Sequence, residues 1–173
     1  MSRFISRLLC EDDDVQQFES GVALLDNWFT TQAVRAHKTG ICAVTVWIDS
    51  EIGQICGYFA ISPTQAVKEV DSLPRSLNSG FSTVPGYRIG RLALASYLQQ
   101  QGLGKQLLLD AIRTAIAASE IAGGRLIIID PIDQQVAAWY DRIGFVPTKD
   151  DSEKPAPRYL TIADAKRTLA EVR

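Results

Sequence analysis

The stretch RLALASYLQQQGLGKQLL, residues 91–108, decides how the rest of the chain is interpreted. It passes from a strand-like segment through a short turn into a run with apolar residues at helical spacing. Gly102 and Gly104 stand where the turn becomes the helix. Glycine lets backbone amides approach a ligand closely, and a helix start directs free N–H groups and its positive dipole end to the same place. The stretch therefore predicts an anion site suited to a phosphate or pyrophosphate.

The glycine pair also has a second interpretation, in which one glycine serves the loop and the other a close helix contact. The pattern alone leaves both interpretations open. The chain has neither a GxxxxGK[ST] motif nor a GxGxxG motif after its first strand. Nucleoside triphosphates and dinucleotides are therefore disfavoured as ligands.

Strand and helix patterns alternate on both sides of this stretch. Before it, the sequence predicts a strand at 3–9, helical spacing over 18–36 broken into two short helices at Gly21, an antiparallel hairpin of 41–49 and 54–62, and a surface excursion at 64–86. Strand 87–95, helix 102–119 and the apolar strand 125–130 then form a β-α-β arrangement, followed by helix 133–143, two short strands and a last helix at 162–172. The fold class predicted is α/β (α+β), with a mixed central β-sheet flanked by helices.

Length and composition set outer limits on the class of protein. The chain has 173 residues, of which 46% are hydrophobic and 22% charged, which predicts a single domain over residues 1–173 and excludes a disordered polymer. No stretch reaches the roughly 18 apolar residues of a membrane span, and the N-terminus lacks the features of a signal peptide. We therefore expect no membrane association and a cytoplasmic location.

Three further counts narrow the chemistry. A single histidine, His37, excludes a two-histidine metal site, and we expect no metal. The three cysteines are widely spaced, which favours small buried thiols in a reducing compartment over disulfides. With 18 basic and 20 acidic side chains the net charge is -2, which gives no global electrostatic argument for nucleic-acid binding.

Two motifs in order resemble the GNAT acyltransferases. QQQGLG at residues 99–104 matches the pyrophosphate motif [R/Q]-x-x-G-x-[G/A], and WYDRIGF at residues 139–145 matches [F/W]-Y-x-x-x-G-F. The resemblance implies a GNAT fold, acetyl-CoA as acetyl donor, and Tyr140 as the catalytic residue facing the thioester. It also implies a set of coenzyme-binding residues on the strand, the loop and the next helix start: Leu92, Ala93, Leu94, Gln99, Gln100, Gln101, Gly102, Leu103, Gly104, Lys105 and Asp133.

A narrower resemblance covers nearly the whole chain. FESGVALLDNWF (18–29), DSLPRSLNSG (71–80), GRLAL (90–94) and RYLTIAD (158–164) are similar to segments of the GNAT toxins of bacterial toxin-antitoxin pairs. The sequence departs from that group at Ala95, where an aspartate is usual, and at Gln100, where a glycine is usual. The resemblance implies acetylation of the α-amine of aminoacyl-tRNA, with consequent inhibition of translation. It further implies a ribbon-helix-helix antitoxin as partner, and a homodimer is one assembly to test.

The residues fit this chemistry. Acyl transfer from a thioester needs an uncharged amine, a donor to the developing oxyanion and an acid for the leaving thiolate. A phenol such as that of Tyr140 stays protonated at neutral pH, and a backbone amide at residues 92–94 is the oxyanion donor that the resemblance implies. An α-amine has a reference pKa of roughly 7.7 to 8.0, so a fraction is already neutral and no strong general base is required.

Binding of tRNA requires basic side chains on the substrate face. The candidates are Arg35, Lys38, Arg75, Arg88, Arg91 and Arg142. We interpret Trp28 and Trp47 as core residues in preference to base-stacking platforms. Two alternatives stay open: a GNAT enzyme that acetylates a small-molecule amine or a protein N-terminus, and a non-catalytic acyl-CoA-binding module.

Overall fold

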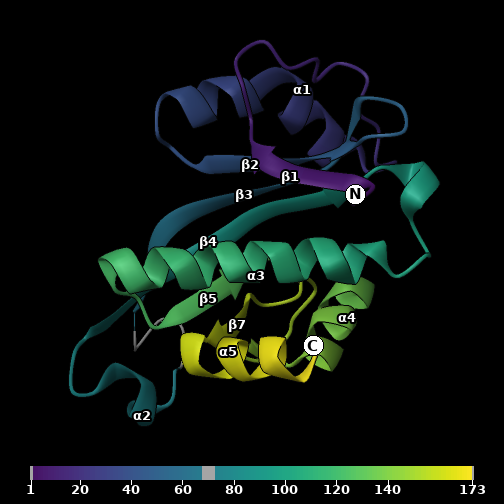
Figure 1. Ribbon diagram of the computed structural model, residues 1–173. Coiled ribbons are helices and arrows are strands. Elements are labelled where there is room, and N and C mark those ends of the chain that lie inside the picture. Colours follow the sequence, from purple (N-terminus) through teal and green to yellow (C-terminus); the bar gives the residue numbers. More distant parts are fainter. Residues whose placement is uncertain (1, 68–72, 173) are drawn as a thin grey trace. The chain divides into compact units, whose positions relative to one another are not determined.

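The computed structural model describes residues 2–67 and 73–172 (Figure 1). The chain folds into two compact units, each built from two separate stretches of sequence. The first comprises Met1–Ser62 and Gly90–Ala111, and the second Pro63–Ile89 and Ile112–Arg173. The predicted extent of a single domain, residues 1–173, stays a prediction. The elements follow in the order β1 (Phe4–Leu8), α1 (Ala23–Lys38), β2 (Ala43–Asp49), β3 (Gln54–Val67), α2 (Arg75–Asn78), β4 (Thr83–Leu94), the 3-10 helix η1 (Ser96–Leu98), α3 (Leu103–Ala122), β5 (Leu126–Ile129), α4 (Gln134–Ile143), β6 (Val146–Pro147), β7 (Arg158–Thr161) and α5 (Ile162–Glu171).

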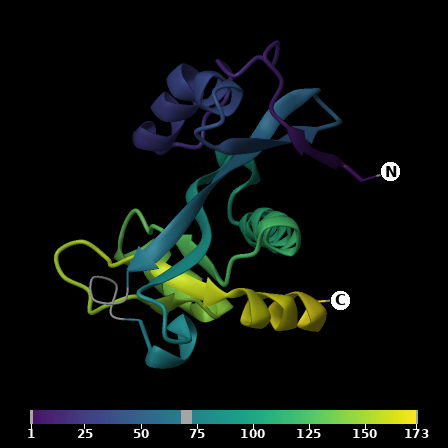
Figure 2. The same cartoon turned by 90° about the vertical axis from the view of Figure 1, so that its left-hand side faces the viewer.

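In the first unit, β1, β2 and β3 form an antiparallel meander that continues into the second part of β4. The register of β2 on β3 runs from Ala43↔Ile61 to Asp49↔Gln54, so the predicted hairpin is confirmed. Tyr58 donates its hydroxyl to Leu25 of α1, whereas a side chain at Gly57 would touch Leu107 of α3. Because successive strand residues face opposite sides, α1 and the start of α3 cover opposite faces of this meander, as Figure 2 shows.

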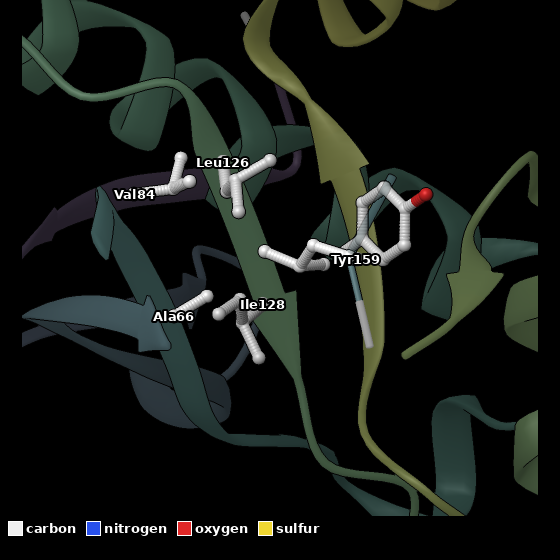
Figure 3. Packing of buried hydrophobic residues seen from close by; sticks show 6 residues of the cluster. Ala66, Val84, Leu126, Ile128 and Tyr159 are labelled. Carbon is white, nitrogen blue, oxygen red and sulfur yellow. The ribbon is translucent and has the colours of Figure 1, made fainter. Parts of the chain in front are cut away.

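In the second unit, β4 pairs in parallel with β5, and β5 pairs antiparallel with β7. Helix α3 connects β4 to β5, so the predicted β-α-β arrangement is confirmed. One face of these strands carries a buried cluster (Figure 3) made of Ala66, Leu73, Val84, Leu126, Ile128 and Tyr159, with Leu77 of α2 packed against it. The other face of β5 is buried as well, since Ile127 and Ile129 are almost fully shielded from solvent, so this strand lies in the core on both sides.

The prediction of two short helices broken at Gly21 is wrong. A single helix, α1, begins at Ala23, and the preceding residues form a turn in which Gly21 has a positive φ of 83°. The Asp26 carboxylate explains the late start: it accepts hydrogen bonds from the backbone N–H and hydroxyl of Ser20 and from the N–H of Gly21. These bonds hold the turn in a non-helical conformation.

The surface excursion expected at 64–86 is shorter than predicted. Strand β3 runs on to Val67 and β4 already begins at Thr83; residues 68–72, including the first two of the segment 71–80, lie outside the described residues. Pro85 and Gly86 look like turn residues, yet both lie in β4. A Cβ at Gly86 would stand 2.3 Å from the backbone oxygen of Leu126, so this glycine serves a close approach of two strands and not a turn.

The predicted mixed sheet with flanking helices is confirmed, with strand order β1-β2-β3-β4-β5-β7-β6. Within the described residues no helix is long and apolar enough to cross a membrane. All three cysteines are free thiols: Cys56 is buried and Cys42 half-buried, but Cys10 is exposed, contrary to the expectation of a buried residue.

Candidate functional site

The loop between β4 and α3 is held in place by the side chain of Gln99. Its Nε2 donates to the backbone oxygens of Ser20 and Leu94, both at 2.8 Å. The N–H of Ser96 adds a bond to the oxygen of Glu19 at 3.0 Å. The first glutamine of the predicted motif is therefore committed to the loop's own structure, and what the loop offers a ligand is backbone.

Two residues of the loop have left-handed backbone. Gln100 has a φ of 60° and Gly102 a φ of 78°. A side chain at Gly102 would meet no atom within 4 Å, so the space beside it is open. The resembled toxins usually have glycine at the position of Gln100, and the positive φ gives the physical reason. A non-glycine residue there costs roughly 1 kcal/mol.

Helix α3 starts at Leu103, directly after this loop, and extends to Ala122. The N–H groups of its first turn have no partner within the helix, and they carry the positive end of the dipole. The first turn holds no acidic residue, while Lys105 is exposed there. The backbone conformation, the open space at Gly102 and the absence of an acid in this turn together fit a pyrophosphate.

The edge of β4 supplies further N–H groups. Ala95 donates its N–H to the oxygen of Cys56 in β3 at 2.8 Å, and a side chain at Gly57 would lie 3.5 Å from the oxygen of Ala93. Ala93 and Ala95 thus direct their backbone groups toward β3. Because these groups alternate along a strand, the N–H groups of Leu92 and Leu94 point to the opposite edge. Of the three strand residues predicted to contact the coenzyme, these two have the suitable orientation.

A buried carboxylate supports the loop, and sequence patterns gave no signal for it. Asp49 is fully buried at the end of β2 and binds Arg3 through two hydrogen bonds of 3.1 and 2.8 Å. Tyr97, in η1, donates its hydroxyl to the same carboxylate at 3.1 Å. The Arg3 guanidinium holds the pKa of Asp49 below its usual range. This cluster ties the start of the loop between β4 and α3 to the end of β2 and to Arg3, the residue before β1.

Tyr140, the predicted catalytic residue, belongs to the second unit. It lies on α4 and is only 5% exposed, with the rings of Trp139 and Phe145 at 5.2 and 5.8 Å from its own. Burial and the Asp130 carboxylate raise the pKa of the Tyr140 phenol. The hydroxyl therefore stays protonated at every physiological pH, as an acid or a hydrogen-bond donor requires.

Asp133 was predicted to bind the coenzyme, and the structure gives it a second task. It is the N-cap of α4, where its Oδ1 accepts the N–H of Val136 at 2.8 Å. An acid at this end of a helix complements the dipole. A coenzyme contact by Asp133 stays a prediction.

The six basic residues predicted for tRNA differ in their surroundings. Lys38 pairs with Glu11 at 2.6 Å and Arg88 with Asp130 at 2.5 Å. Arg91 lies over the ring of Trp28, 4.7 Å from its centroid. The other three are exposed, and the described residues show no ion pair for them: Arg35, Arg75 and Arg142.

Arg91 has a feature that sets it apart from the other cations. Its Nε is buried and has no hydrogen-bond partner within the described residues. Trp28 also stacks on Tyr58, at 5.9 Å between ring centroids, so the cation rests on an aromatic layer. Trp47 is a buried core residue as expected, but Trp28 is half-buried and its ring packs against the Arg91 guanidinium.

The single histidine also has a structural role. His37 lies in the last turn of α1 and its Nδ1 accepts the N–H of Val44 at 3.0 Å. Across the residues that the structure describes, no group of three or more His, Cys, Asp or Glu side chains could hold a metal ion.

No protein-family model matches the sequence. A curated relative is the tRNA-acetylating toxin of Mycobacterium tuberculosis (strain ATCC 25618 / H37Rv), which is 27% identical over 165 residues, 95% of this chain and 96% of the relative. The suspected resemblance to tRNA-acetylating toxins is confirmed by this similarity.

Solved structures share the fold. AtaT complexed with acetyl-methionyl-tRNAfMet is 22% identical with a TM-score of 0.83, covering 96% of this chain and 99% of that one. AtaTR bound with acetyl-CoA is 22% identical with a TM-score of 0.82, covering 98% and 99%. A tyrosine-to-phenylalanine mutant of KacT is 17% identical with a TM-score of 0.83, covering 96% and 99%. The predicted GNAT fold is confirmed by these matches.

Proposed function

We propose that this protein is an N-acetyltransferase that moves the acetyl group of acetyl-CoA to the α-amine of aminoacyl-tRNA, and that it acts as a toxin by blocking translation. One observation carries the proposal. The backbone cradle of residues 99–105 lies in a chain that is similar to a tRNA-acetylating toxin over 95% of its length. The cradle supports acetyl-CoA as the acetyl donor, and the similarity supports aminoacyl-tRNA as the acceptor.

The donor binds through backbone groups. The N–H groups of the loop and of the first turn of α3, from Gln100 to Lys105, hold the pyrophosphate, and the charge of Lys105 adds to the dipole. Leu92 and Leu94 pair with the pantetheine along the edge of β4. One of these two N–H groups is also the donor to the oxyanion of the tetrahedral intermediate.

Tyr140 assists the departure of the thiolate. The amine nitrogen attacks the thioester carbonyl carbon, a C–N bond forms, and the C–S bond then breaks. The Tyr140 hydroxyl donates its proton to the departing sulfur and takes up the proton that the new amide nitrogen must lose, so the phenol never stays ionised. Its raised pKa favours this relay over full ionisation.

The acceptor must be an amine that is already partly neutral. An α-amine meets this condition near pH 7.5, whereas a lysine side chain, with a reference pKa near 10.4, does not. The described part of the chain offers His37 as the only imidazole, and that ring accepts a backbone N–H. An α-amine therefore suits an enzyme without a strong general base.

The surroundings of the reaction follow from the substrates. Charged tRNA and acetyl-CoA place the proposed activity in the cytoplasm. AtaT, a solved structure with this fold, is bound to the C-terminus of its antitoxin AtaR in one complex. We propose an antitoxin of the ribbon-helix-helix type for this protein and a homodimer as its free form, to be checked by light scattering on the purified chain and on its complex.

The test is transfer of labelled acetyl from acetyl-CoA to a pool of charged tRNA. Deacylated tRNA and free amino acids are the controls. Label on charged tRNA alone, released with the aminoacyl group, is the expected result, and fractionation of the pool then identifies the acceptor.

Two results would contradict the proposal. Transfer to free amines or peptides but not to charged tRNA would assign the enzyme a small-molecule or N-terminal acceptor. Binding of acetyl-CoA without transfer to any amine would make the chain a non-catalytic acyl-CoA-binding module.

A further inference from the structure

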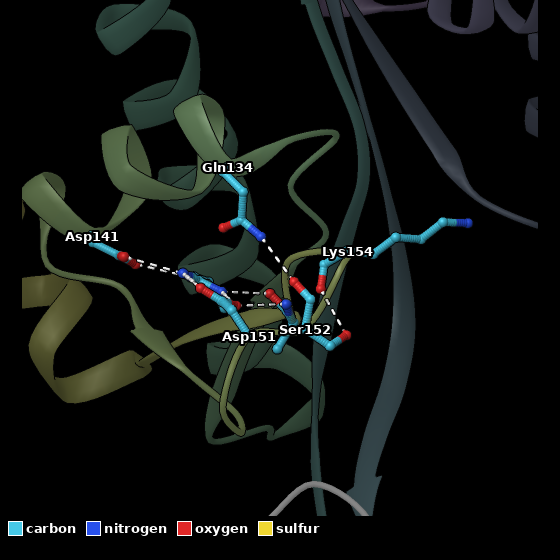
Figure 4. A network of polar contacts seen from close by, with 7 residues as sticks. Gln134, Asp141, Asp151, Ser152 and Lys154 are labelled. Atoms are coloured by element: carbon cyan, nitrogen blue, oxygen red, sulfur yellow. Dashed lines mark hydrogen bonds and ion pairs between the residues drawn. The ribbon is translucent and has the colours of Figure 1, made fainter.

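The second unit contains an arginine whose hydrogen-bonding capacity is fully used. The side chain of Arg158, on β7, is only 3% exposed. Its Nε and Nη2 donate to the two oxygens of Asp141 at 2.9 and 3.2 Å, and its Nη1 and Nη2 donate to the two oxygens of Asp151 at 2.6 and 2.9 Å. Nη1 also donates to the oxygen of Ala156 at 2.8 Å. The five N–H groups of the guanidinium therefore make five bonds. Figure 4 shows Asp141 and Asp151 within this network.

These bonds join three separate parts of the unit. Asp141 belongs to α4 and directly follows Tyr140, Arg158 belongs to β7, and Asp151 lies in the loop between β6 and β7. Asp151 also accepts the N–H of Ala156 at 2.8 Å, which closes the loop on itself. At the other end of α4, Gln134 donates to the oxygen of Ser152 in the same loop at 3.4 Å. The loop is therefore attached to both ends of α4.

The charges and the paired bonds make this arrangement sensitive to the loss of either carboxylate. One buried cation stands between two carboxylates, so a change to either carboxylate leaves the guanidinium with unsatisfied donors. Planar, paired bonds also fix direction, which a single contact does not. Because Asp141 is held by both of its oxygens, α4 cannot turn about its axis without breaking two bonds.

We propose that Arg158, together with Asp141 and Asp151, is a positioning device that fixes the rotation of α4 and with it the direction of the Tyr140 phenol. Arg158 does not touch substrate; it acts through Tyr140. The inference rests on the proposed function insofar as Tyr140 is the acid. Its structural half, the restraint of α4, stands independently of the substrate.

The test is Asp151→Asn, which keeps an oxygen acceptor but removes the charge and one paired bond. We expect kcat for acetyl transfer to fall about tenfold, with the KM for acetyl-CoA changed less than about twofold, because small misplacement of a catalytic group is costly. In the Tyr140→Phe background, Asp151→Asn should cause no further loss. A device that acts only through Tyr140 requires this non-additivity.

Asp164→Asn is the matched control. It makes the same chemical change in the same unit, at the exposed ion pair with Arg167 on α5, and should leave kcat unchanged. An equal loss of activity from Asp151→Asn with and without the Tyr140 hydroxyl would overturn the proposal, since the residue would then act on general stability.

Hydrogen exchange gives a readout that needs no substrate. In Asp151→Asn the amides of α4 should exchange faster, while those of α5 keep their rates. Unchanged exchange in α4 would overturn the inference even if wild-type protein acetylates tRNA. If the wild-type protein fails to acetylate tRNA, the proposed function falls, and the exchange rates still decide whether Arg158 restrains α4.

Discussion

The hydroxyl of Tyr140 is the group on which the proposed chemistry depends most directly. We expect Tyr140→Phe to lower kcat roughly a hundredfold or more, because general acids contribute about 10²–10⁴ to rates. The affinity for acetyl-CoA, measured by calorimetric titration, should persist, since the proposed donor contacts are backbone groups. Tyr87→Phe removes the same atom from a hydroxyl that bonds to the backbone oxygens of Ala118 and Gly123, and it serves as control, with kcat close to that of the wild type. Unchanged turnover in Tyr140→Phe would remove this residue from the mechanism.

Gly102 allows a test of the coenzyme loop. Because its φ is 78° and the space beside it is open, Gly102→Ala should cost about 1 kcal/mol through backbone strain and not through a clash. The loop would relax, and acetyl-CoA should bind more weakly; thermal unfolding and titration measure the two effects. Gln100→Gly, at the neighbouring left-handed position, should retain acetyl-CoA binding. Equal affinity in Gly102→Ala and wild type would show that the loop does not hold the coenzyme.

The ion pair between Asp151 and Arg158 should make the stability of the folded protein sensitive to acid. Its bonds to Arg158 lower its pKa from 3.8 to about 2. A carboxyl group with a lowered pKa in the folded state adds stability above its unfolded pKa, and that stability is lost as the pH falls toward the folded value. The free energy of unfolding should therefore drop between about pH 4 and pH 2, and less steeply in Asp151→Asn. Asp13 and Asp49, whose pKa values are also lowered, contribute to the same slope in both proteins. Identical slopes in both proteins would contradict the assignment.

At the level of the element, α4 offers a clean separation of two roles for Asp133. Asp133→Ala removes the N-cap and should cost about 1 kcal/mol, whereas Asp133→Asn keeps a capping oxygen and should cost little. Denaturant unfolding checks both values. If Asp133 also contacts the coenzyme, Asp133→Asn should change the KM for acetyl-CoA although it retains stability. If the KM changes only in Asp133→Ala, the variant that loses stability, Asp133 acts as the helix cap alone.

Elements with a regular apolar period were predictable from the sequence. The hairpin β2–β3, helix α3 and strand β5 each bury a continuous face, and packing against it preserves the local preference. The start of α1 was not predictable, because the Asp26 carboxylate accepts hydrogen bonds from residues of a turn that lie five and six positions earlier. The start of β4 was not predictable either, because Gly86 allows the close approach of a neighbouring strand and does not form a turn. Long-range partners decide both cases.

In the candidate site, too, local patterns were predictable from the sequence and contacts between distant residues were not. The motif predicted an anion cradle, and the positive φ at Gly102 and the start of α3 agree with it. Sequence patterns did not predict the roles of Gln99 and Asp49, because each side chain depends on one partner more than forty positions away. The extent of the site residues stays a prediction until a ligand is bound.

For the molecule as a whole, the net charge of -2 gives tRNA no overall electrostatic attraction to the protein. Binding of charged tRNA should rest on a few local cations and so weaken only moderately as salt rises. Arg35→Glu and Arg142→Glu should each raise the KM for tRNA several-fold and leave the KM for acetyl-CoA unchanged. Arg167→Glu, an equally large charge change at an exposed site, is the control. A similar effect of all three would indicate bulk charge and not a defined tRNA surface.

Each compact unit is assembled from two stretches that are distant in the sequence, with β3, β4 and α3 carrying the chain from one to the other. This arrangement has a consequence for biosynthesis. A nascent polypeptide lacks a finished first unit until residue 111 has left the ribosomal exit tunnel, and the second unit needs β7 and α5 as well. Fragments released from stalled ribosomes therefore contain no complete acetyltransferase. A protein that we propose to silence translation is thus inactive until both of its units have been synthesised.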